Sequence, residues 1–447
     1  MGKGYSATIA SNPVRSFACI GGGLFGLDIS SMSGVLNNPA YEDTFGHPDS
    51  SHQGAIVAAM PGTSFIGALA VSKLADNGWI WVIGSILQCA AVDRGMLVMG
   101  RVVSGLAVGI ASTIVPIYQS EITAPAIRGR LFVEFGCSYI NGVASFRIPW
   151  GLQIIPAIVL SMGMLLFPES PRWLVDHYRS KEAFEILADL HGGGDTKASL
   201  VQLEYSEIQE QVSFERAEGT KSYLDLLKPG IRRRVGLGCA LQMWSQLTGM
   251  NIMMYYIVYV FEGAGLTGRR GNLIADSIQY VLNVALTFPA IIHIDKWGRR
   301  PMLLVGTMGF WLMLVGGLQG RFGHWGEVDG DRVSVITGNM AATKAIIVSW
   351  TYPAEIFPMK VRAKAVSLAT AVNWIFNLAL AFAVPLGLSS IAYKTYFIFG
   401  TFNFAAFIHI FFCFPETAQR SLEGDVGKKR IEDVHVHSGE KVGVETT

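Results

Sequence analysis

The chain has 447 residues, of which 51% are hydrophobic and 15% charged, and its formal net charge at pH 7 is +1. Soluble globular domains carry about 25% charged residues, so this composition excludes an ordinary soluble protein and indicates membrane-spanning helices. The short basic run at 232–234 gives no indication of a nucleic-acid partner. Five scattered cysteines without a C-x-x-C pair predict neither a disulfide framework nor a metal site.

Apolar stretches of about 20 residues, the length that spans the hydrocarbon of a bilayer, recur along the chain. They lie at 17–36, 54–75, 96–118, 150–167, 235–261, 274–294, 302–318, 363–388 and 393–414. Three further stretches, at 79–91, 131–146 and 345–349, are too short to span. The first span contains Asp28, which does not suit the core of a cleavable signal peptide.

Charged residues are segregated from these spans. They crowd into 168–234, where Ala183, Leu187 and Leu190 recur at helical spacing, and into the tail after Glu416. We therefore expect an all-α integral membrane protein with four parts. These are an N-terminal transmembrane bundle at 1–167, a helical linker at 168–234, a C-terminal transmembrane bundle at 235–415 and a tail at 416–447. The excess of Lys and Arg in alternate loops places the linker and both termini in the cytoplasm.

One motif occurs twice. The pattern Tyr-x-x-Glu-Ile, with an Arg seven positions after the Glu, is found at 118–128 and again at 352–362. A repeat with a period near half the chain length indicates a duplicated unit. In an apolar chain, such halves are typical of a transporter whose two bundles rock about a central site.

The repeat also allows the lengths of corresponding intervals in the two halves to be compared. Glu121 precedes Pro168 by 47 residues, whereas the corresponding Glu355 precedes Pro415 by 60. The first interval therefore lacks about half a spanning helix, given the length that a span requires. We infer that sequence is missing near 76–78, 131–132 and 349–350, and that the third, fifth and tenth helices are truncated.

The motifs of this chain resemble those of the sugar porter family of the major facilitator superfamily, and in particular the fungal high-affinity glucose transporters. The resemblance covers essentially the whole chain. It is carried by Phe25-Gly26-Leu27-Asp28, Gly100-Arg101, Pro168-Glu169-Ser170-Pro171-Arg172, Gln246-Leu247-Thr248-Gly249, Asp295-Lys296-Trp297-Gly298-Arg299-Arg300, Asn373-Trp374 and Pro415-Glu416-Thr417. The family fold that this implies is two six-helix bundles joined by a helical cytoplasmic linker.

Amides and phenols gather around a glycine in the span at 235–261. Amides both donate and accept hydrogen bonds, which suits a neutral polyhydroxyl ligand, and Gly249 allows the helix to break at mid-membrane. By resemblance, Gln246 and Asn251 contact a sugar, Tyr255 and Tyr256 form the extracellular gate, and Asn283, Trp350 and Asn373 complete the pocket. Ser245 stands where many relatives have a second glutamine. The alternative is that these polar groups only hold helices together.

Asp28 is an acid inside an otherwise uncharged span, and such residues are costly and often functional. We expect Arg101 to be its partner. Burial favours the protonated carboxyl and pairing with arginine favours the carboxylate, so alternation between the two environments can load and release a proton. In the family, an acid at this place goes with proton-coupled uptake. The alternative is a structural ion pair.

A second group of charges lies at predicted cytoplasmic helix ends. By resemblance they form a salt-bridge gate that locks the outward-open state, and the members are Glu121, Arg128, Glu169, Arg299, Arg300, Glu355, Arg362 and Glu416. Exposed ion pairs contribute about 0–1 kcal/mol each, so a network is needed to hold one conformation. The alternative is that these charges only anchor the helices at the membrane surface.

We therefore expect a plasma-membrane hexose transporter of the proton-symport type, not an enzyme, with no cofactor other than the coupling proton and with a monomeric state. Its partners are the sugar and the lipid bilayer. A second hypothesis is a non-transporting sugar sensor of the same fold, although the short tail after Pro415 is unlike the long tails of such receptors. A third is a truncated, non-functional product, because a helix too short to span leaves its backbone unsatisfied.

Overall fold

The computed structural model describes residues 32, 35, 39–46, 48–70, 79–119, 144–166, 171–191, 195, 199–218, 222–229, 231–249, 255–256, 298–307, 352, 356–357, 361–391 and 393–416. Within these ranges the regular elements are helices and no strand occurs. They are α2 (Pro39–Phe45), α3 (Ser50–Leu69), α5 (Trp79–Cys89), α6 (Arg94–Gln119), α8 (Ala144–Leu152), α9 (Ile154–Leu166), α10 (Pro171–Asp176), α11 (Ser180–His191), α12 (Ser199–Glu218), the 3-10 helix η1 (Tyr223–Leu227), α13 (Ile231–Leu247), α16 (Arg299–Gly306), α20 (Arg362–Ile391) and α21 (Lys394–Cys413).

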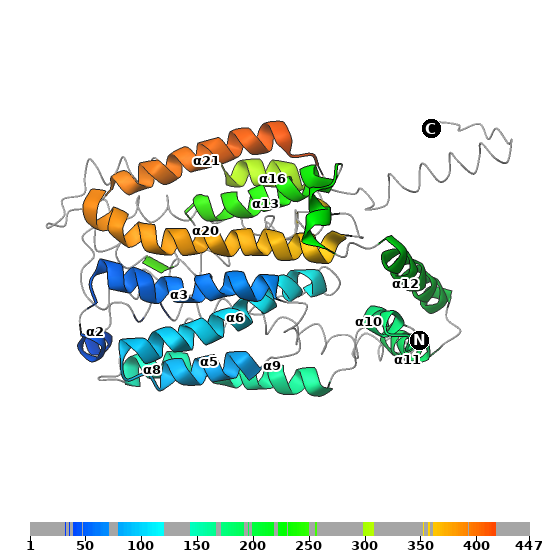
Figure 1. Ribbon diagram of the computed structural model, residues 1–447, viewed down its shortest axis with the longest axis horizontal. Coiled ribbons are helices and arrows are strands. Elements are labelled where there is room, and N and C mark those ends of the chain that lie inside the picture. The colour runs from blue at the N-terminus through cyan, green and yellow to red at the C-terminus, as the bar shows by residue number, and fades with distance from the viewer. Residues whose placement is uncertain are drawn as a thin grey trace, which may run out of the picture.

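The long helices lie roughly parallel and form two groups (Figure 1). Helices α3, α5, α6, α8 and α9 come from the first half of the chain, and α13, α16, α20 and α21 from the second. The two groups meet where α3 packs against α20. Helices α10, α11 and α12 lie beyond one end of the bundle, which we call the linker end, and α2 lies at the opposite end.

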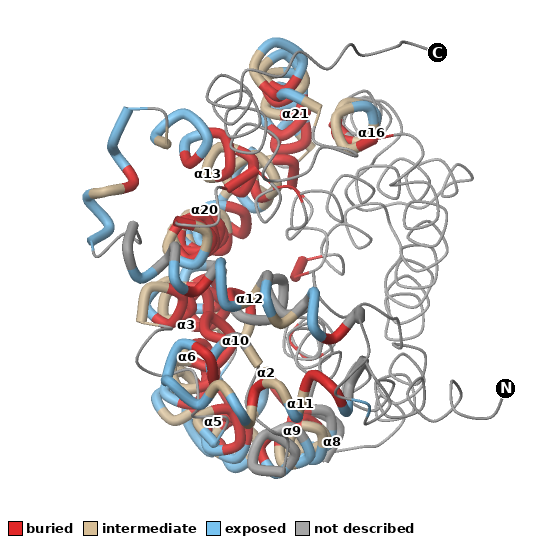
Figure 2. Tube along the Cα trace, turned by 90° about the vertical axis from the view of Figure 1, so that its right-hand side faces the viewer, coloured by how far each residue is buried: buried red, intermediate tan, exposed pale blue. Residues whose placement is uncertain are grey.

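Three of the predicted spans are confirmed as long apolar helices. By length and composition, Arg94–Thr113, Arg362–Ile391 and Lys394–Cys413 could each cross a membrane. Figure 2 shows these helices end-on, with buried residues lying where neighbouring helices meet. On α21, Phe404 and Phe412 are 61% and 77% exposed. Such large exposed apolar side chains suit a surface that faces lipid.

The span predicted at 150–167 is helical in its described part, 150–166, but is interrupted once. Helix α8 ends at Leu152, Gln153 forms a turn, and α9 begins at Ile154. Pro156 explains the interruption, because it has no N–H to donate to the carbonyl of Leu152, four residues earlier. The helix also begins earlier than predicted, at Ala144.

The described part of α5 has 11 residues, which at 1.5 Å per residue is about 16 Å, whereas the hydrocarbon core is about 30 Å thick. Residues 71–78 directly before it lie outside the described part of the chain, as do 120–143 and 308–351. The truncation of the third, fifth and tenth helices therefore stays a prediction.

Glycines on α6 allow α3 to approach very closely. A Cβ built on Gly105 would lie 2.1 Å from Thr63 Oγ1, and one on Gly109 would lie 2.1 Å from the Ser64 carbonyl oxygen. The Ser64 hydroxyl donates a hydrogen bond of 2.9 Å to the carbonyl of Gly105. Without a hydrophobic driving force between helices in lipid, such small-residue contacts stabilise the pairing.

The linker folds as a small helical unit, as its periodicity predicts. Leu174 and Val175 of α10 pack on Ala183 of α11 and Val212 of α12. Arg216 of α12 donates to the Asp176 side chain at 3.1 Å. Helix α13 then begins at Ile231, close to the predicted boundary at 234–235.

Hydroxyl groups join the two groups of helices at the linker end. Ser367 of α20, which is buried, donates to the Ala68 carbonyl of α3 at 2.6 Å. The hydroxyl of Tyr223 in η1 lies 3.1 Å from Ser367 Oγ and donates to the Leu69 carbonyl at 3.4 Å. The last carbonyls of a helix have no intrahelical donor, so the C-terminus of α3 is capped by the other helix group and by the linker.

We predict that Ser367→Ala weakens this junction by about 0.5–1.5 kcal/mol, the usual net contribution of one neutral hydrogen bond. Spin labels on the linker ends of α3 and α20 should report a larger population at long distance. Ser389→Ala is the matched control, because Ser389 is exposed and bonds only within α20. An unchanged distance distribution in Ser367→Ala would contradict the prediction.

Candidate functional site

Four amide side chains face one another across the contact between α13 and α20. Gln242 and Gln246 are one turn apart on α13, and Asn373 and Asn377 are one turn apart on α20. All four are buried, with at most 5% exposed. Buried amides must find hydrogen-bond partners, because leaving such a group unsatisfied costs about 1–3 kcal/mol.

Asn373 is at the centre of the cluster. Its Oδ1 accepts from Gln246 Nε2 at 2.9 Å, and its Nδ2 donates to Gln242 Oε1 at 2.8 Å and to Ser245 Oγ at 3.1 Å. The Ser245 hydroxyl in turn donates to the Gln242 carbonyl at 2.8 Å. Ser245 therefore orients Asn373.

Asn377 has an acceptor to spare. Its Nδ2 donates to Gln246 Oε1 at 3.2 Å. Its Oδ1 is buried and has no hydrogen-bond partner among the residues that the structure describes. A neutral acceptor of this kind can accept a hydrogen bond from a hydroxyl group of a ligand.

Helix α13 breaks directly after this cluster. It ends at Leu247, and Gly249 has a φ of +86°, in the left-handed region that favours glycine. The Gly249 N–H donates to the Gln246 carbonyl at 3.0 Å. The predicted break at Gly249 is confirmed.

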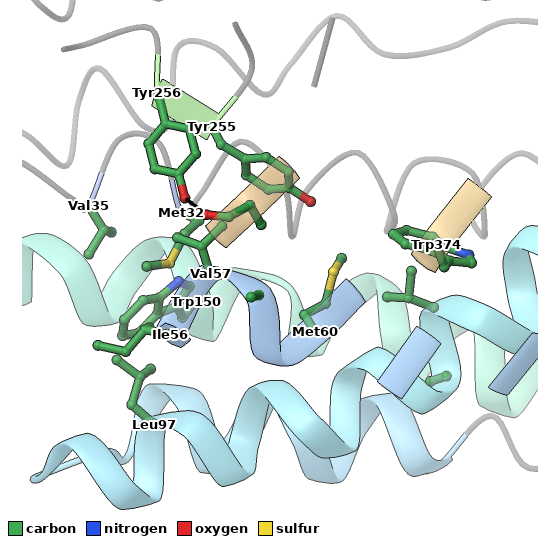
Figure 3. Close-up of a cluster of buried hydrophobic side chains, with 14 of the residues drawn as sticks. Met32, Val35, Ile56, Val57, Met60, Leu97, Trp150, Tyr255, Tyr256 and Trp374 are labelled. Atoms are coloured by element: carbon green, nitrogen blue, oxygen red, sulfur yellow. Dashed lines mark hydrogen bonds between the residues drawn. The ribbon is translucent and has the colours of Figure 1, made fainter. Parts of the chain in front are cut away.

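The two tyrosines beyond the break are buried in the largest apolar cluster. Figure 3 shows Tyr255 and Tyr256 near Met32 and Val57, which belong to the first half of the chain and to the same cluster. The Tyr256 hydroxyl donates to the Ala381 carbonyl of α20 at 2.8 Å.

Pro385 is the physical reason for that hydrogen bond. It lies inside α20, four residues after Ala381, and has no N–H to donate to the Ala381 carbonyl. Tyr256 supplies the missing donor. The Tyr256 side chain is therefore held against α20 at the point where Pro385 removes a helical hydrogen bond.

A further hydrogen bond links the amide cluster to the first half of the chain. The indole N–H of Trp374, next to Asn373, donates to Ser112 Oγ of α6 at 2.9 Å. Ser112 also donates to the Gly109 carbonyl at 3.0 Å. Both side chains are buried. A displacement of α20 that moves Asn373 therefore also strains or breaks the hydrogen bond from Trp374 to Ser112 on α6.

Arg101 lies on α6 and is fully buried. Its Nη1 lies 3.3 Å from Met32 Sδ, and its Nε and Nη2 have no hydrogen-bond partner in the described residues. Asp28 is four residues before Met32 in the sequence and falls outside those residues. A buried guanidinium without an anion is costly, so the surroundings of Arg101 favour a carboxylate nearby.

At the linker end, Glu416 caps the N-terminus of α16. Its two carboxylate oxygens accept from the backbone N–H groups of Arg299 and Arg300 at 2.8 and 2.9 Å. Gly298 before them has a φ of +84°. A Cβ there would lie 2.6 Å from Glu416 Oε2. A carboxylate at a helix N-terminus compensates the exposed N–H groups and the helix dipole.

A family model described as "Sugar (and other) transporter" matches residues 14–424. The chain belongs to this family, within the major facilitator superfamily. It is 47% identical to the MFS glucose transporter mfs1 of Aspergillus flavus, over 91% of this chain and 87% of that protein. It is 41% identical to the high-affinity glucose transporter of Kluyveromyces lactis, over 91% and 82% of the two chains. A member of this family is a multi-pass membrane protein and not an enzyme.

The fold of this sugar transporter family member is also found among solved structures. The proton:xylose symporter XylE bound to 6-bromo-6-deoxy-D-glucose matches with a TM-score of 0.76 and 22% identity, over 93% of this chain and 98% of that one. The expected major facilitator fold is thereby confirmed.

The alignment with the Aspergillus flavus relative indicates internal gaps in this chain. It extends over 464 residues and includes 91% of this chain, whereas the chain has only 447 residues. Several tens of positions in the relative therefore have no counterpart. This agrees with the inference of missing internal sequence, whose positions stay a prediction.

The described residues hold only part of the predicted site. Gln246, Asn373, Tyr255, Tyr256 and Arg101 are placed as above, and Arg299, Arg300, Arg362 and Glu416 lie at the linker end. Asp28, Asn251, Asn283, Trp350, Glu121, Arg128, Glu169 and Glu355 fall outside. The salt-bridge gate thus stays a prediction. The contacts of Glu416 with α16 lie within the second half of the chain.

Sequence reasoning did not find Gln242, Asn377 or Ser112. Gln242 lies four residues before Gln246, and Asn377 lies four residues after Asn373. Polar residues four apart share a helix face, so this spacing could have revealed the two amides. Ser112 carries no such signal, because its role depends on a helix from the other half of the chain.

We predict that Gly249→Ala destabilises the protein. A non-glycine residue at positive φ costs about 1–2 kcal/mol, and a Cβ at Gly249 would also lie 3.2 Å from the Phe399 ring. Thermal unfolding in detergent should show a lower midpoint.

Gly236→Ala on the same helix is the control. A Cβ at Gly236 meets nothing within 4 Å, so alanine should stabilise that position slightly through helix propensity. Equal midpoints for the two variants would refute the assigned conformation of Gly249.

Proposed function

We propose that this sugar transporter family member carries a hexose, with glucose as the first candidate, across the plasma membrane by alternating access. The supporting observation is the buried amide cluster of α13 and α20, in which Asn377 Oδ1 has no partner among the described residues. The groups of this cluster are uncharged, which suits a neutral polyhydroxyl ligand. Relatives at 47% and 41% identity are named glucose transporters.

Alternating access requires contacts between the two helix groups that can form and break. The hydrogen bonds from Trp374 to Ser112 and from Ser367 to Ala68 have this character. They join helices of different halves and involve single hydroxyls. We assign the linker end to the cytoplasm, as the distribution of Lys and Arg suggests, and the ion-pair gate to the same end. The protein acts as a monomer in this proposal.

We further propose that uptake is coupled to a proton on Asp28, with no other cofactor. Arg101 supports this proposal because it is buried and has two guanidinium nitrogens without a partner in the described part of the chain. Met32, which touches Arg101, is four residues after Asp28 in the sequence. A carboxylate facing Arg101 would be held ionised and would accept a proton when the pair separates.

Two alternatives remain as outcomes of the tests. A sugar sensor of the same fold would bind sugar without moving it. A truncated product would fail to accumulate in the membrane, because short helices leave backbone groups unsatisfied in lipid. Sequencing the transcript across the codons for 76–78, 131–132 and 349–350 would show whether the internal gaps are present in the message.

Uptake of labelled glucose in a yeast strain without hexose transporters tests the proposed substrate. We expect uptake by the wild type and a KM about three- to tenfold higher for Asn377→Leu, because one hydrogen bond to the sugar is lost. Thr395→Val is the control, because Thr395 lies in the first turn of α21, outside the amide cluster, and its hydroxyl makes no hydrogen bond to the described residues. Normal surface expression without uptake would favour the sensor, and absence of the protein would favour the truncated product.

Proton coupling has a separate test. We predict that an uncoupler and the Asp28→Asn variant both abolish accumulation of sugar against its gradient, because the neutral amide cannot carry a proton. Exchange of sugar at equal concentrations on both sides should persist in Asp28→Asn. Accumulation that survives both treatments, or a wild type that takes up sugar without accumulating it, would show that uptake is not coupled to a proton on Asp28.

A further inference from the structure

Asn403 of α21 is buried, with 2% exposed, and no part of the predicted site includes it. Its Nδ2 donates to the Thr248 carbonyl at 3.2 Å and to the Phe399 carbonyl at 2.8 Å. Thr248 lies between the amide cluster and the glycine that breaks α13. Asn403 thus connects a neighbouring helix to the end of the helix that carries Gln246.

The orientation of the Asn403 amide follows from its two contacts. Both neighbours are carbonyl oxygens, which only accept hydrogen bonds. The NH₂ group must therefore point at them, because an amide oxygen there would face two acceptors without a donor. One amide hydrogen of Asn403 bonds the Phe399 carbonyl, one turn earlier on α21, and this contact fixes the Asn403 side chain. Its second amide hydrogen then points at the Thr248 carbonyl.

The last turn of α13 is held by hydrogen bonds of Thr248 and Gly249 to carbonyls earlier in the helix. The Trp244 carbonyl accepts from the Thr248 N–H at 2.9 Å, and the Ser245 carbonyl accepts from the Thr248 hydroxyl at 2.9 Å. The Gln246 carbonyl accepts from the Gly249 N–H at 3.0 Å. These contacts keep the last turn closed.

Helix α13 ends at Leu247, and residue 252, whose N–H would bond the Thr248 carbonyl in a continuing helix, lies outside the described residues. Thr248 itself is only 2% exposed. A buried carbonyl without a partner costs about as much as a lost hydrogen bond. Among the described residues, Asn403 supplies a donor to this carbonyl.

Helix α21 also contacts the glycine of the break. The Phe399 ring lies 3.2 Å from a Cβ built on Gly249. Phe399 and Asn403 are one turn apart, so one face of α21 touches both residues of the turn at 248–249. The position of this turn is set by α21.

We propose that Asn403 is a positioning residue for the ligand: by holding the Thr248 carbonyl, it fixes the break in α13 and thereby the direction of the Gln246 amide toward Asn373 and Asn377. The proposal rests on the proposed sugar transport and adds a helix that itself places no side chain in the described amide cluster. Gln246 is two residues before Thr248, so a shift of the turn moves the Gln246 side chain directly. Loss of this anchor alters which sugar hydroxyls are recognised.

The test compares Asn403→Leu, which keeps the approximate size and removes the donor, with Thr395→Val on the same helix. Glucose uptake and competition by a panel of analogues, each lacking one hydroxyl, give affinity and specificity. For Asn403→Leu we expect a KM raised about three- to tenfold, little change in the maximal rate per surface molecule, and smaller differences among the analogues. For Thr395→Val we expect wild-type values.

A second measurement does not depend on sugar. Amide hydrogen exchange of the peptide that covers residues 244–249 should be faster in purified Asn403→Leu and unchanged in Thr395→Val. If Asn403→Leu does not reach the membrane, Asn403→Ser is the substitute. It should change KM, the analogue profile and the exchange rate in the same direction, because the smaller serine hydroxyl is too short to reach both carbonyls.

The outcomes separate the two proposals. Faster exchange together with a flattened analogue profile supports the positioning role. Unchanged exchange, or faster exchange with the wild-type analogue profile and KM, overturns it. A wild type that takes up no sugar overturns the proposed function, while the exchange experiment still decides whether Asn403 holds the break.

Discussion

The described structure depends on how backbone carbonyls find donors where helical hydrogen bonding is interrupted. In lipid every N–H and C=O must find a partner inside the protein, so a lost helical hydrogen bond requires a donor from elsewhere. Pro385 inside α20 leaves the carbonyl of Ala381 without its helical donor, and Tyr256 supplies one. Next to the break at Gly249, the carbonyl of Thr248 accepts from Asn403. Both interruptions follow the amide cluster in the chain direction of their helices, so the backbone is irregular next to the proposed ligand site.

The amide cluster combines two requirements. Gln242 and Asn373 satisfy each other and keep α13 against α20, as interhelical hydrogen bonds do in many membrane proteins. Asn377 retains a buried acceptor that has no partner among the described residues, whereas buried polar groups usually have one. The proposed ligand binding rests on this difference between Asn377 and Asn373.

Among the described residues, hydroxyl groups form hydrogen bonds between the two halves, while the predicted charged gate lies partly outside those residues. Ser112 and Ser367 form bonds that cross from one half to the other, whereas Glu416 holds the start of α16 within its own half. Single neutral bonds contribute about 0.5–1.5 kcal/mol each. Contacts of this strength can break and re-form, which is what the proposed alternating access requires of them.

The sequence by itself determined the membrane class, the positions of three long spans, the linker, the break at Gly249 and the family. These follow from local properties, namely apolar length, helical periodicity and motif spacing, and the ends of α6, α20 and α21 lie within three residues of the predicted spans. Only the tertiary structure decided to which carbonyls Tyr256 and Asn403 donate, that Asn377 Oδ1 has no partner among the described residues and that Ser112 meets Trp374. Each of these depends on two helices far apart in the sequence, and the identity of a hydrogen-bond partner is fixed by how those helices pack.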